Sequence, residues 1–267
     1  MYLKTPWGQV HYQKYGKGSR LLIAFHGFAH NATSFRGWSQ QLSDVFTIYA
    51  IDIPFHGATQ WQLHAYGPGQ LQEVIKLILK QESQERFEAV GYSLGGRLWL
   101  AMLDRMAHQV DGLYLLAPDG LATRWSAITD GMPLPLRRQL SRWSECPDQI
   151  LKWANILSEK GWLHQVGLRY LQQHLQTDES RARLFGTWCA QRWFKLPRKK
   201  LLFLFKKHKI PTLILLGKKD PLINSRNIKR LFARLRHVRI VEMDAGHFLV
   251  NQEAAQLIRQ TALLKKQ

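Results

Sequence analysis

Six short apolar runs constrain the fold of this 267-residue chain more than any other feature of its sequence. The runs are LLIAF (21–25), FTIYAI (46–51), FEAVGY (87–92), GLYLLA (112–117), TLILLG (212–217) and VRIVEM (238–243). Short runs that are apolar almost throughout, with little alternation of polar residues, are typical of strands buried on both faces of a parallel sheet. The sequence therefore predicts a sheet of this kind as the centre of the fold.

Segments of helical character separate the apolar runs. We expect helices over residues 33–42, 70–81, 94–106 and 252–264, the second of these with its apolar residues on one face. Before them, YLKTPWGQVHYQKYGKG reads as two strands that turn at Pro6, Trp7 and Gly8. The alternation predicts an α/β fold, with a mostly parallel, twisted sheet and helices on both faces.

Residues 121–205 interrupt this alternation. The segment has no convincing strand and holds six of the ten tryptophans, at positions 125, 143, 153, 162, 188 and 193. Short helices are expected around 149–162 and 168–176. We therefore predict a core formed by residues 1–120 and 206–267, with a helical cap inserted at 121–205.

Composition narrows the class of protein. Hydrophobic residues make up 45% of the chain and charged residues 21%, which is typical of a globular protein with a large core. The first residues lack the apolar stretch of a signal peptide, and nowhere does an apolar run approach the roughly 20 residues that cross a bilayer. We expect a cytoplasmic protein. Cys146 and Cys189 are too few for a disulfide framework and lack metal-ligand spacing, so they are expected to be packing thiols.

The balance of charge is strongly basic. The chain has 38 Lys and Arg against 19 Asp and Glu, a net charge of +19, and six of the basic residues fall between Arg198 and Lys209 while the rest look scattered. A surplus of this size suggests a polyanion as partner, but no zinc-finger spacing, RNA-binding aromatic motif or heptad zipper accompanies it. Nucleic acid is therefore not expected. A solvated basic surface is the first interpretation, and weak association with an anionic membrane surface or an anionic substrate is the second.

The most informative motif is AVGYSLGGRL (89–98), which sets Ser93 between Gly91 and Gly95 where a strand should pass into a helix. A serine hydroxyl is a weak nucleophile, so an enzyme must expose it and supply a base. A sharp strand-to-helix turn exposes the serine, and the residues two before and two after it must be small because they approach each other closely. Ser93 is therefore the candidate nucleophile, with Tyr92 beside it in the turn.

Attack by serine produces an oxyanion, which two backbone N–H groups must stabilise. One donor is expected from Leu94, directly after the serine, and the other from Phe28 in the FHGF segment that follows an early strand. Gly27 would let this loop approach the serine. His26 is expected to brace the loop rather than to take part in chemistry.

A base and an acid must lie at the same edge of the sheet as the serine. His247 in MDAGHFLV follows the last predicted strand and is the candidate base, ahead of His56 and His26. Asp220 in LLGKKDPLI follows the strand before it and is the candidate acid, with Asp119 in LLAPDG as its rival. Asp52 in DIPFHG is instead expected to bond loop amides.

In this order the motifs resemble those of the α/β-hydrolase superfamily, in its serine esterase and lipase-like branch with a helical cap. The matching segments are FHGF, DIPFHG, GYSLGG, GKKDPL and AGHF, and they span nearly the whole chain. Relatives often have a second glycine before the histidine of DIPFHG, a departure that leaves the three candidate catalytic residues untouched. The cap has no motif that identifies a substrate.

The resemblance implies hydrolysis of an ester or thioester of a small to medium, partly apolar substrate through an acyl-enzyme, with no metal or organic cofactor. Hydrolysis of a carbon–carbon bond in diketone-like acids uses the same triad and stays open. A protein of this fold that binds a ligand or a membrane surface without catalysis is the alternative from another class. The sequence does not predict the oligomeric state.

Overall fold

A computed structural model describes residues 1–121, 147–161 and 165–264 of the chain. Nine strands form one sheet among these residues. The strands are β1 (Tyr2–Thr5), β2 (Gly8–Tyr15), β3 (Arg20–Phe25), β4 (Phe46–Ile51), β5 (Gln60–Trp61), β6 (Phe87–Tyr92), β7 (Val110–Leu116), β8 (Thr212–Gly217) and β9 (Val238–Met243). All six strands expected from the apolar runs are present.

The sheet has the order β1-β2-β4-β3-β6-β7-β8-β9, with β5 paired to β2. From β4 to β9 every pairing is parallel, whereas the β1–β2 hairpin and its junction with β4 are antiparallel. The predicted fold class, an α/β-hydrolase fold with a mostly parallel sheet and helices on both faces, is therefore confirmed. Because the strands are parallel, the loops that follow β3, β4, β6, β7, β8 and β9 meet at one edge, here called the carboxyl edge.

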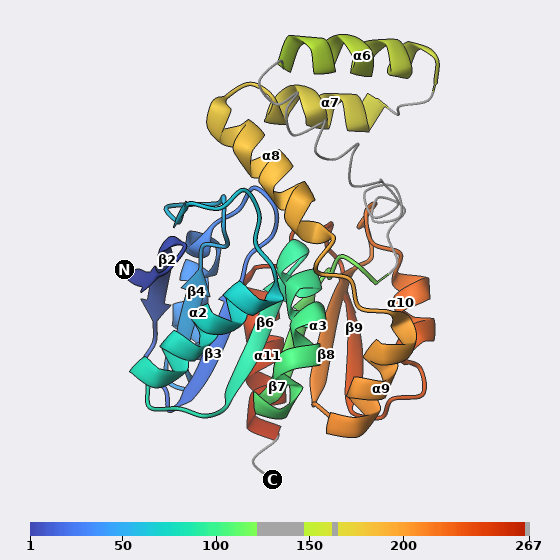
Figure 1. Cartoon of the computed structure of the whole chain (residues 1–267). Helices are drawn as coiled ribbons and strands as arrows, with labels where there is room; N and C mark the ends of the chain where they lie inside the picture. Colours follow the sequence, from blue (N-terminus) through green and yellow to red (C-terminus); the bar gives the residue numbers. More distant parts are fainter. Residues whose placement is uncertain (122–146, 162–164, 265–267) are drawn as a thin grey trace.

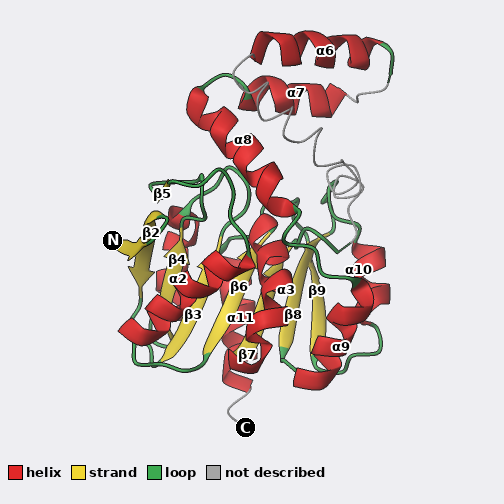
Figure 2. Cartoon of the chain, in the orientation of Figure 1, coloured by secondary structure: helices red, strands yellow, loops and turns green. Residues whose placement is uncertain are grey.

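Helices cover both faces of the sheet (Figure 1). They are η1 (Ala32–Trp38), α1 (Ser39–Leu42), α2 (Pro68–Gln81), α3 (Leu94–Met106), η2 (Ala107–Gln109), α6 (Pro147–Glu159), α7 (Gln165–His174), α8 (Asp178–Gln191), α9 (Arg198–His208), α10 (Ser225–Phe232) and α11 (Gln252–Leu264). Helix α3 packs between α2 and α9, while α1 packs on α11. Figure 2 shows α11 behind the strands and α2, α3 and α9 in front of them.

One predicted helix differs in form from expectation. Residues 33–42 were expected to be one α-helix, but the structure has the 3-10 helix η1 followed by the single α-helical turn α1. The side chain of Asn31 caps η1 by accepting a hydrogen bond from the Thr33 amide. Gly37 lies inside the segment, and glycine lowers helix propensity. The helices α8, α9 and α10 were not delimited from the sequence.

Helices α6, α7 and α8 stand above the carboxyl edge (Figure 1). Helix α7 packs on both α6 and α8, and Ile150, Leu175, Leu184 and Phe185 form a small apolar cluster between them. Gly186 of α8 lies so close to the Phe55 ring that a Cβ atom there would meet it at 2.6 Å. This contact fixes α8 over the loop that follows β4.

The division into a core and a cap at 121–205 stays a prediction. Helix α9 spans residue 205, and its Leu201, Leu204 and Phe205 are buried in the main core. Of the six cap tryptophans, Trp188 packs against the apolar cluster, and Trp153 and Trp193 are exposed. The predictions for Trp125, Trp143, Trp162 and Cys146 lie outside the described residues.

Candidate active site

Ser93 stands at a sharp turn between β6, which ends at Tyr92, and α3, which begins at Leu94. Its φ of 49° and ψ of −110° are unusual for a residue with a side chain, and such strain is found mainly at functional sites. A Cβ on Gly91 would lie 2.5 Å from the carbonyl carbon of Gly95, and a Cβ on Gly95 would lie 2.1 Å from the carbonyl oxygen of Phe25. Only glycine fits at either position.

Hydrogen bonds hold the strained backbone of Ser93. Its amide donates to the carbonyl of Leu116 at 2.9 Å, and its own carbonyl accepts from the amides of Gly96 and Asp119 at 3.0 Å each. The turn is therefore tied to both β7 and the loop that follows it. The residue stays partly exposed to solvent, as a nucleophile must be.

The three residues expected at the carboxyl edge form one hydrogen-bonded chain. His247 Nε2 lies 3.0 Å from Ser93 Oγ, and His247 Nδ1 lies 2.7 Å from Asp220 Oδ2. When Nδ1 carries the proton, it donates to Asp220, and Nε2 can then accept the proton of the Ser93 hydroxyl. This is the arrangement that removes a proton from a serine as it attacks.

The carboxylate of Asp220 is well held. Its side chain is only 1% exposed, and Oδ1 accepts hydrogen bonds from the amides of Leu222 at 2.8 Å and Ile223 at 3.2 Å. Burial by itself would raise the pKa of Asp220, but the hydrogen bonds from His247 and the two amides bring the pKa below its ordinary value. The group is therefore ionised at neutral pH.

The rival acid, Asp119, lies beside the turn but has other partners. Arg97 donates to its Oδ2 at 3.4 Å, and the Gly120 amide donates to its Oδ1 at 2.6 Å. His247 Nδ1 lies within hydrogen-bond distance of Asp220, and that carboxylate accepts its proton. Of the two candidates left open by the sequence, the geometry therefore favours Asp220.

The two expected oxyanion donors belong to two segments that meet at the serine. Leu94 is the first residue of α3, and the first amides of a helix have no partner within it. Phe28 follows Gly27, where a Cβ would lie 3.4 Å from the Cβ of Ser93 and 2.7 Å from the Tyr92 ring. The loop thus approaches Ser93 as closely as Gly27 allows, and the ring of Phe28 packs against the apolar cluster of α6–α8.

His26 and His56 are both buried, and neither is bonded to Ser93 in the way that His247 is. His26 Nδ1 donates to the carbonyl of Gly27 at 2.7 Å, and its Nε2 accepts from the Ile53 amide at 3.2 Å. Burial and the neighbouring His56 lower the pKa of His26 to about 3. Burial likewise lowers the pKa of His56 to about 4. His26 links the loops after β3 and β4, which is a bracing contact.

Asp52 joins the same pair of loops and a strand. Its Oδ2 accepts from the Ala58 amide at 2.8 Å and lies 2.7 Å from His11 Nδ1, and its Oδ1 accepts from the Ala32 amide at 2.5 Å. A Cβ on Gly57 would lie 2.0 Å from the carboxylate, and Gly57 has a φ of 56°. These bonds fix the loop that carries His56, as the sequence suggested for Asp52.

Two side chains that the sequence analysis did not single out complete the surroundings of His247. The rings of His30 and Phe248 stack with centroids 5.4 Å apart, and each also meets the ring of Tyr92 edge to face. Tyr92 in turn lies 5.5 Å from the His247 ring. The stack joins the loop of the oxyanion donor to the loop of His247. The only sequence signal for this stack was that Phe248 directly follows His247.

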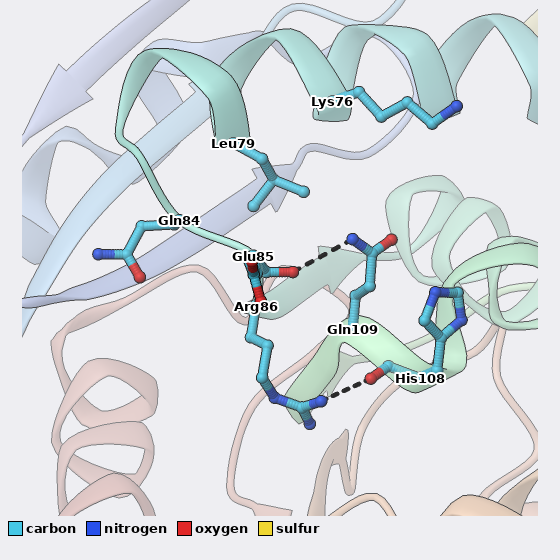
Figure 3. Close-up of a pocket in the computed structure, with 7 residues that line it drawn as sticks. All are labelled: Lys76, Leu79, Gln84, Glu85, Arg86, His108 and Gln109. Carbon is cyan, nitrogen blue, oxygen red and sulfur yellow. Dashed lines mark hydrogen bonds between the residues drawn. The ribbon is translucent and has the colours of Figure 1, made fainter.

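Two surface hollows are found outside this hydrogen-bonded chain. One, of about 380 Å³, lies beside α3 and is lined by Arg97, Asp119 and Arg198 among apolar side chains. The other, of about 420 Å³, is shown in Figure 3 and includes residues 84–86 before β6 and His108 before β7, so it lies at the opposite edge of the sheet. Ser93, Asp220 and His247 line neither hollow.

The described residues contain no cluster of three or more His, Cys, Asp or Glu side chains that could hold a metal ion. Among the described residues, no helix has the length and apolar character needed to span a bilayer.

The fold and the geometry at the carboxyl edge together define a protein of the α/β-hydrolase class. A family model described as alpha/beta hydrolase fold matches residues 20–254. The chain therefore belongs to the α/β-hydrolase fold family, and its fold and relatives identify it as a hydrolase.

Among known proteins, the uncharacterized hydrolase YugF of Bacillus subtilis is 24% identical over 253 residues, which is 93% of this chain and 91% of that protein. Pimeloyl-[acyl-carrier protein] methyl ester esterase of Cronobacter sakazakii is 30% identical over 135 residues, about half of each chain (49% and 50%). The solved structure of MGS-M2, an alpha/beta hydrolase enzyme from a Medee basin deep-sea metagenome library, has a TM-score of 0.71 at 15% identity and covers 100% of this chain and 98% of that chain.

Proposed function

We propose that the chain hydrolyses carboxylic esters through an acyl-enzyme. Ser93 is the nucleophile, His247 is the base, and the carboxylate of Asp220 orients His247. The observation that carries the proposal is the continuous chain of hydrogen bonds, 2.7 Å from Asp220 to His247 and 3.0 Å from His247 to Ser93. Neither Ser93 nor His247 is fully buried, so a substrate can approach the pair.

In the first step Ser93 Oγ bonds to the carbonyl carbon of the ester while its proton passes to His247 Nε2. The amides of Leu94 and Phe28 stabilise the oxyanion, and the amino end of α3 adds its positive dipole. His247 then gives the proton to the departing alcohol, leaving an acyl group on Ser93. A water molecule then attacks the acyl carbon as one of its protons passes to His247. In the tetrahedral intermediate that results, the bond from carbon to Ser93 Oγ breaks, His247 returns the proton to Oγ, and the carboxylic acid is released.

The surroundings of the site support a partly apolar substrate. Phe28, the expected oxyanion donor, packs its ring on the apolar cluster formed by Ile150, Leu175, Leu184 and Phe185. An acyl chain bound beside the oxyanion donors would therefore meet apolar side chains of α6–α8. The half-length resemblance to a methyl ester esterase fits an oxygen ester as the scissile bond.

An anionic group on the substrate is a further part of the proposal. Residues 121–205 hold 14 Lys and Arg against 6 Asp and Glu, so the predicted cap segment is basic. A substrate with a carboxylate should then be hydrolysed with a higher kcat/KM at low salt than at high salt. If neutral short-chain esters are preferred at every salt concentration, the basic cap does not select the substrate.

Hydrolysis of a p-nitrophenyl ester series by the wild type and Ser93→Ala tests the proposal. We expect Ser93→Ala and His247→Gln to lose at least about 10⁴-fold in kcat. His64→Gln, at an exposed histidine, is the matched control and should keep wild-type activity. Equal activity in Ser93→Ala would overturn the mechanism. A matched ester and thioester of one acyl group separates these two substrate classes, and a diketone-like acid tests carbon–carbon hydrolysis.

A further inference from the structure

The positive charge of the chain is concentrated in one stretch. Residues 198–239 hold 14 of the 38 Lys and Arg but one acidic residue, Asp220. The rest of the chain holds 24 Lys and Arg against 18 Asp and Glu. All fourteen basic side chains of this stretch are exposed. The basic residues are thus less scattered than they look along the sequence, and this stretch supplies most of the net charge.

Packing brings part of the stretch together at one corner of the molecule. The ring of Phe205 on α9 lies 5.1 Å from Phe232 on α10 and stacks at 6.2 Å on His237, in the segment before β9. Figure 1 shows α9 and α10 next to each other at the β9 end of the sheet. The ends of both helices and this segment form what we call the basic corner: Lys206, Lys207, Lys209, Arg230, Arg234 and Arg236.

The basic corner has no acidic counterpart in the part of the chain that the structure describes. Two nearby cations outside it are paired, Lys200 with Asp104 at 2.6 Å and Lys229 with Glu242 at 2.7 Å. None of the six residues of the basic corner forms an ion pair with a described residue. Like charges gathered without partners repel one another and attract external anions.

An exposed aromatic side chain accompanies the charge. Helix α9 buries Leu201, Leu204 and Phe205, yet its Phe203 is 59% exposed. Phe203 lies one turn from Lys199 and from Lys207 on the same helix, so an apolar ring stands among ammonium groups. A surface helix that combines basic residues with an exposed phenylalanine is typical of proteins that lie on a membrane surface.

The hollow in Figure 3 adjoins this region, because η2, which includes His108, packs on α9. Its cations are already neutralised: Lys76 pairs with Glu73 at 2.8 Å and Arg86 with Asp111 at 2.6 Å. These two residues therefore add no unpaired cation to the basic corner.

We propose that the basic corner and Phe203 form a docking surface for a bilayer that contains anionic phospholipid. Headgroup phosphates would pair with the six cations, while the ring of Phe203 enters the interface. Helix α9 runs into β8 and residues 233–237 run into β9, so the basic corner lies at the amino edge of the sheet, away from Ser93 at the carboxyl edge. Docking would tether the protein without covering its active site.

Vesicle binding tests this surface directly. A basic residue near an anionic membrane contributes about fivefold to binding, so the triple variant Lys206→Gln, Lys207→Gln, Arg234→Gln should bind phosphatidylserine-containing vesicles roughly 100-fold more weakly. The matched control, Lys4→Gln, Lys17→Gln, Lys80→Gln, removes the same charge from exposed positions at the other end of the sheet and should bind as the wild type does. Equal losses in the two variants would overturn the assigned surface.

The identity of the partner has its own test. Phe203→Ala should weaken binding to the same vesicles about tenfold and leave the weak electrostatic attraction to duplex DNA unchanged. Vesicles of phosphatidylcholine alone should not bind. Tighter binding to DNA than to anionic vesicles, unaffected by Phe203→Ala, would mean a nucleic-acid surface and refute the proposal. Hydrolysis of a soluble ester should be unchanged in all these variants, so folding and the proposed reaction are checked independently.

Discussion

Replacing Asp220 by Asn separates the roles of the two candidate acids. The Asn side chain has nearly the same shape, and its Oδ1 can still accept hydrogen bonds from the Leu222 and Ile223 amides. In the wild type these bonds to Asp220 Oδ1 are 2.8 and 3.2 Å long. What changes is the contact with His247 at 2.7 Å, where an NH₂ group would replace a carboxylate oxygen. The amide would donate to Nδ1, so the proton would move to Nε2 and that atom could no longer accept from Ser93.

The expected loss is large because the site has the wrong tautomer and also loses a buried countercharge to the imidazolium. A loss of this kind is about 10⁴-fold in kcat, which corresponds to about 5.5 kcal/mol of transition-state stabilisation. The matched variant Asp119→Asn changes a carboxylate whose described partners are Arg97 and Gly120, so its kcat should fall less than about tenfold.

The assay is steady-state hydrolysis of a p-nitrophenyl ester, with the free energy of unfolding measured in urea for both variants. Because the pKa of Asp220 in the folded protein is below its ordinary value, its carboxylate stabilises the fold at neutral pH, and this contribution is lost as pH falls through the lowered pKa. Asp220→Asn should lack that acid-dependent loss. A 10⁴-fold fall in Asp119→Asn with normal activity in Asp220→Asn would refute the assignment.

Three further changes test the surroundings of the site. Gly27→Ala would put a methyl group 2.7 Å from the Tyr92 ring, so the oxyanion loop should shift and kcat should fall about 100-fold in the ester assay. Burial lowers the pKa of His56 to about 4 from the ordinary 6.5, so acid favours the unfolded state, in which this histidine takes up a proton more readily. From pH 7 to pH 5 the wild type should lose about 2 kcal/mol of unfolding free energy that His56→Gln retains. The same pH dependence of the unfolding free energy in both proteins, measured in urea, would contradict this. Phe248→Ala removes the stacking partner of His30, and we expect about a tenfold lower kcat with under about 1 kcal/mol lost from stability; an unchanged kcat would leave the stack without a role in positioning.

Most strands of the core were predictable because both layers of helices bury them. Phe46–Ile51, for example, is apolar at all but one position, and five of its six residues are buried. The 3-10 form of residues 32–38 was not predictable, because it depends on tertiary contacts such as the Ala32 amide with Asp52. Helix α10 was not delimited from the sequence, because its buried residues Ile228 and Phe232 stand among polar ones and form only a short apolar stripe.

The candidate site followed from chain topology more than from any single motif. Ser93, Asp220 and His247 each follow a parallel strand, and parallel strands bring such residues to one edge. Whether Asp220 or Asp119 faces the histidine depends on loop conformation, which single-sequence patterns do not determine. The basic corner was missed for a related reason: its residues belong to three segments, and only the contacts of Phe205 bring them together.

Covalent labelling measures the central claim most directly. A fluorophosphonate reacts with a serine that is both exposed and activated by a base, so mass spectrometry of the digested protein should place one adduct on Ser93. The adduct should be absent after Ser93→Ala and form far more slowly after His247→Gln. An adduct on another residue, or labelling of Ser93 at the same rate without His247, would contradict the account.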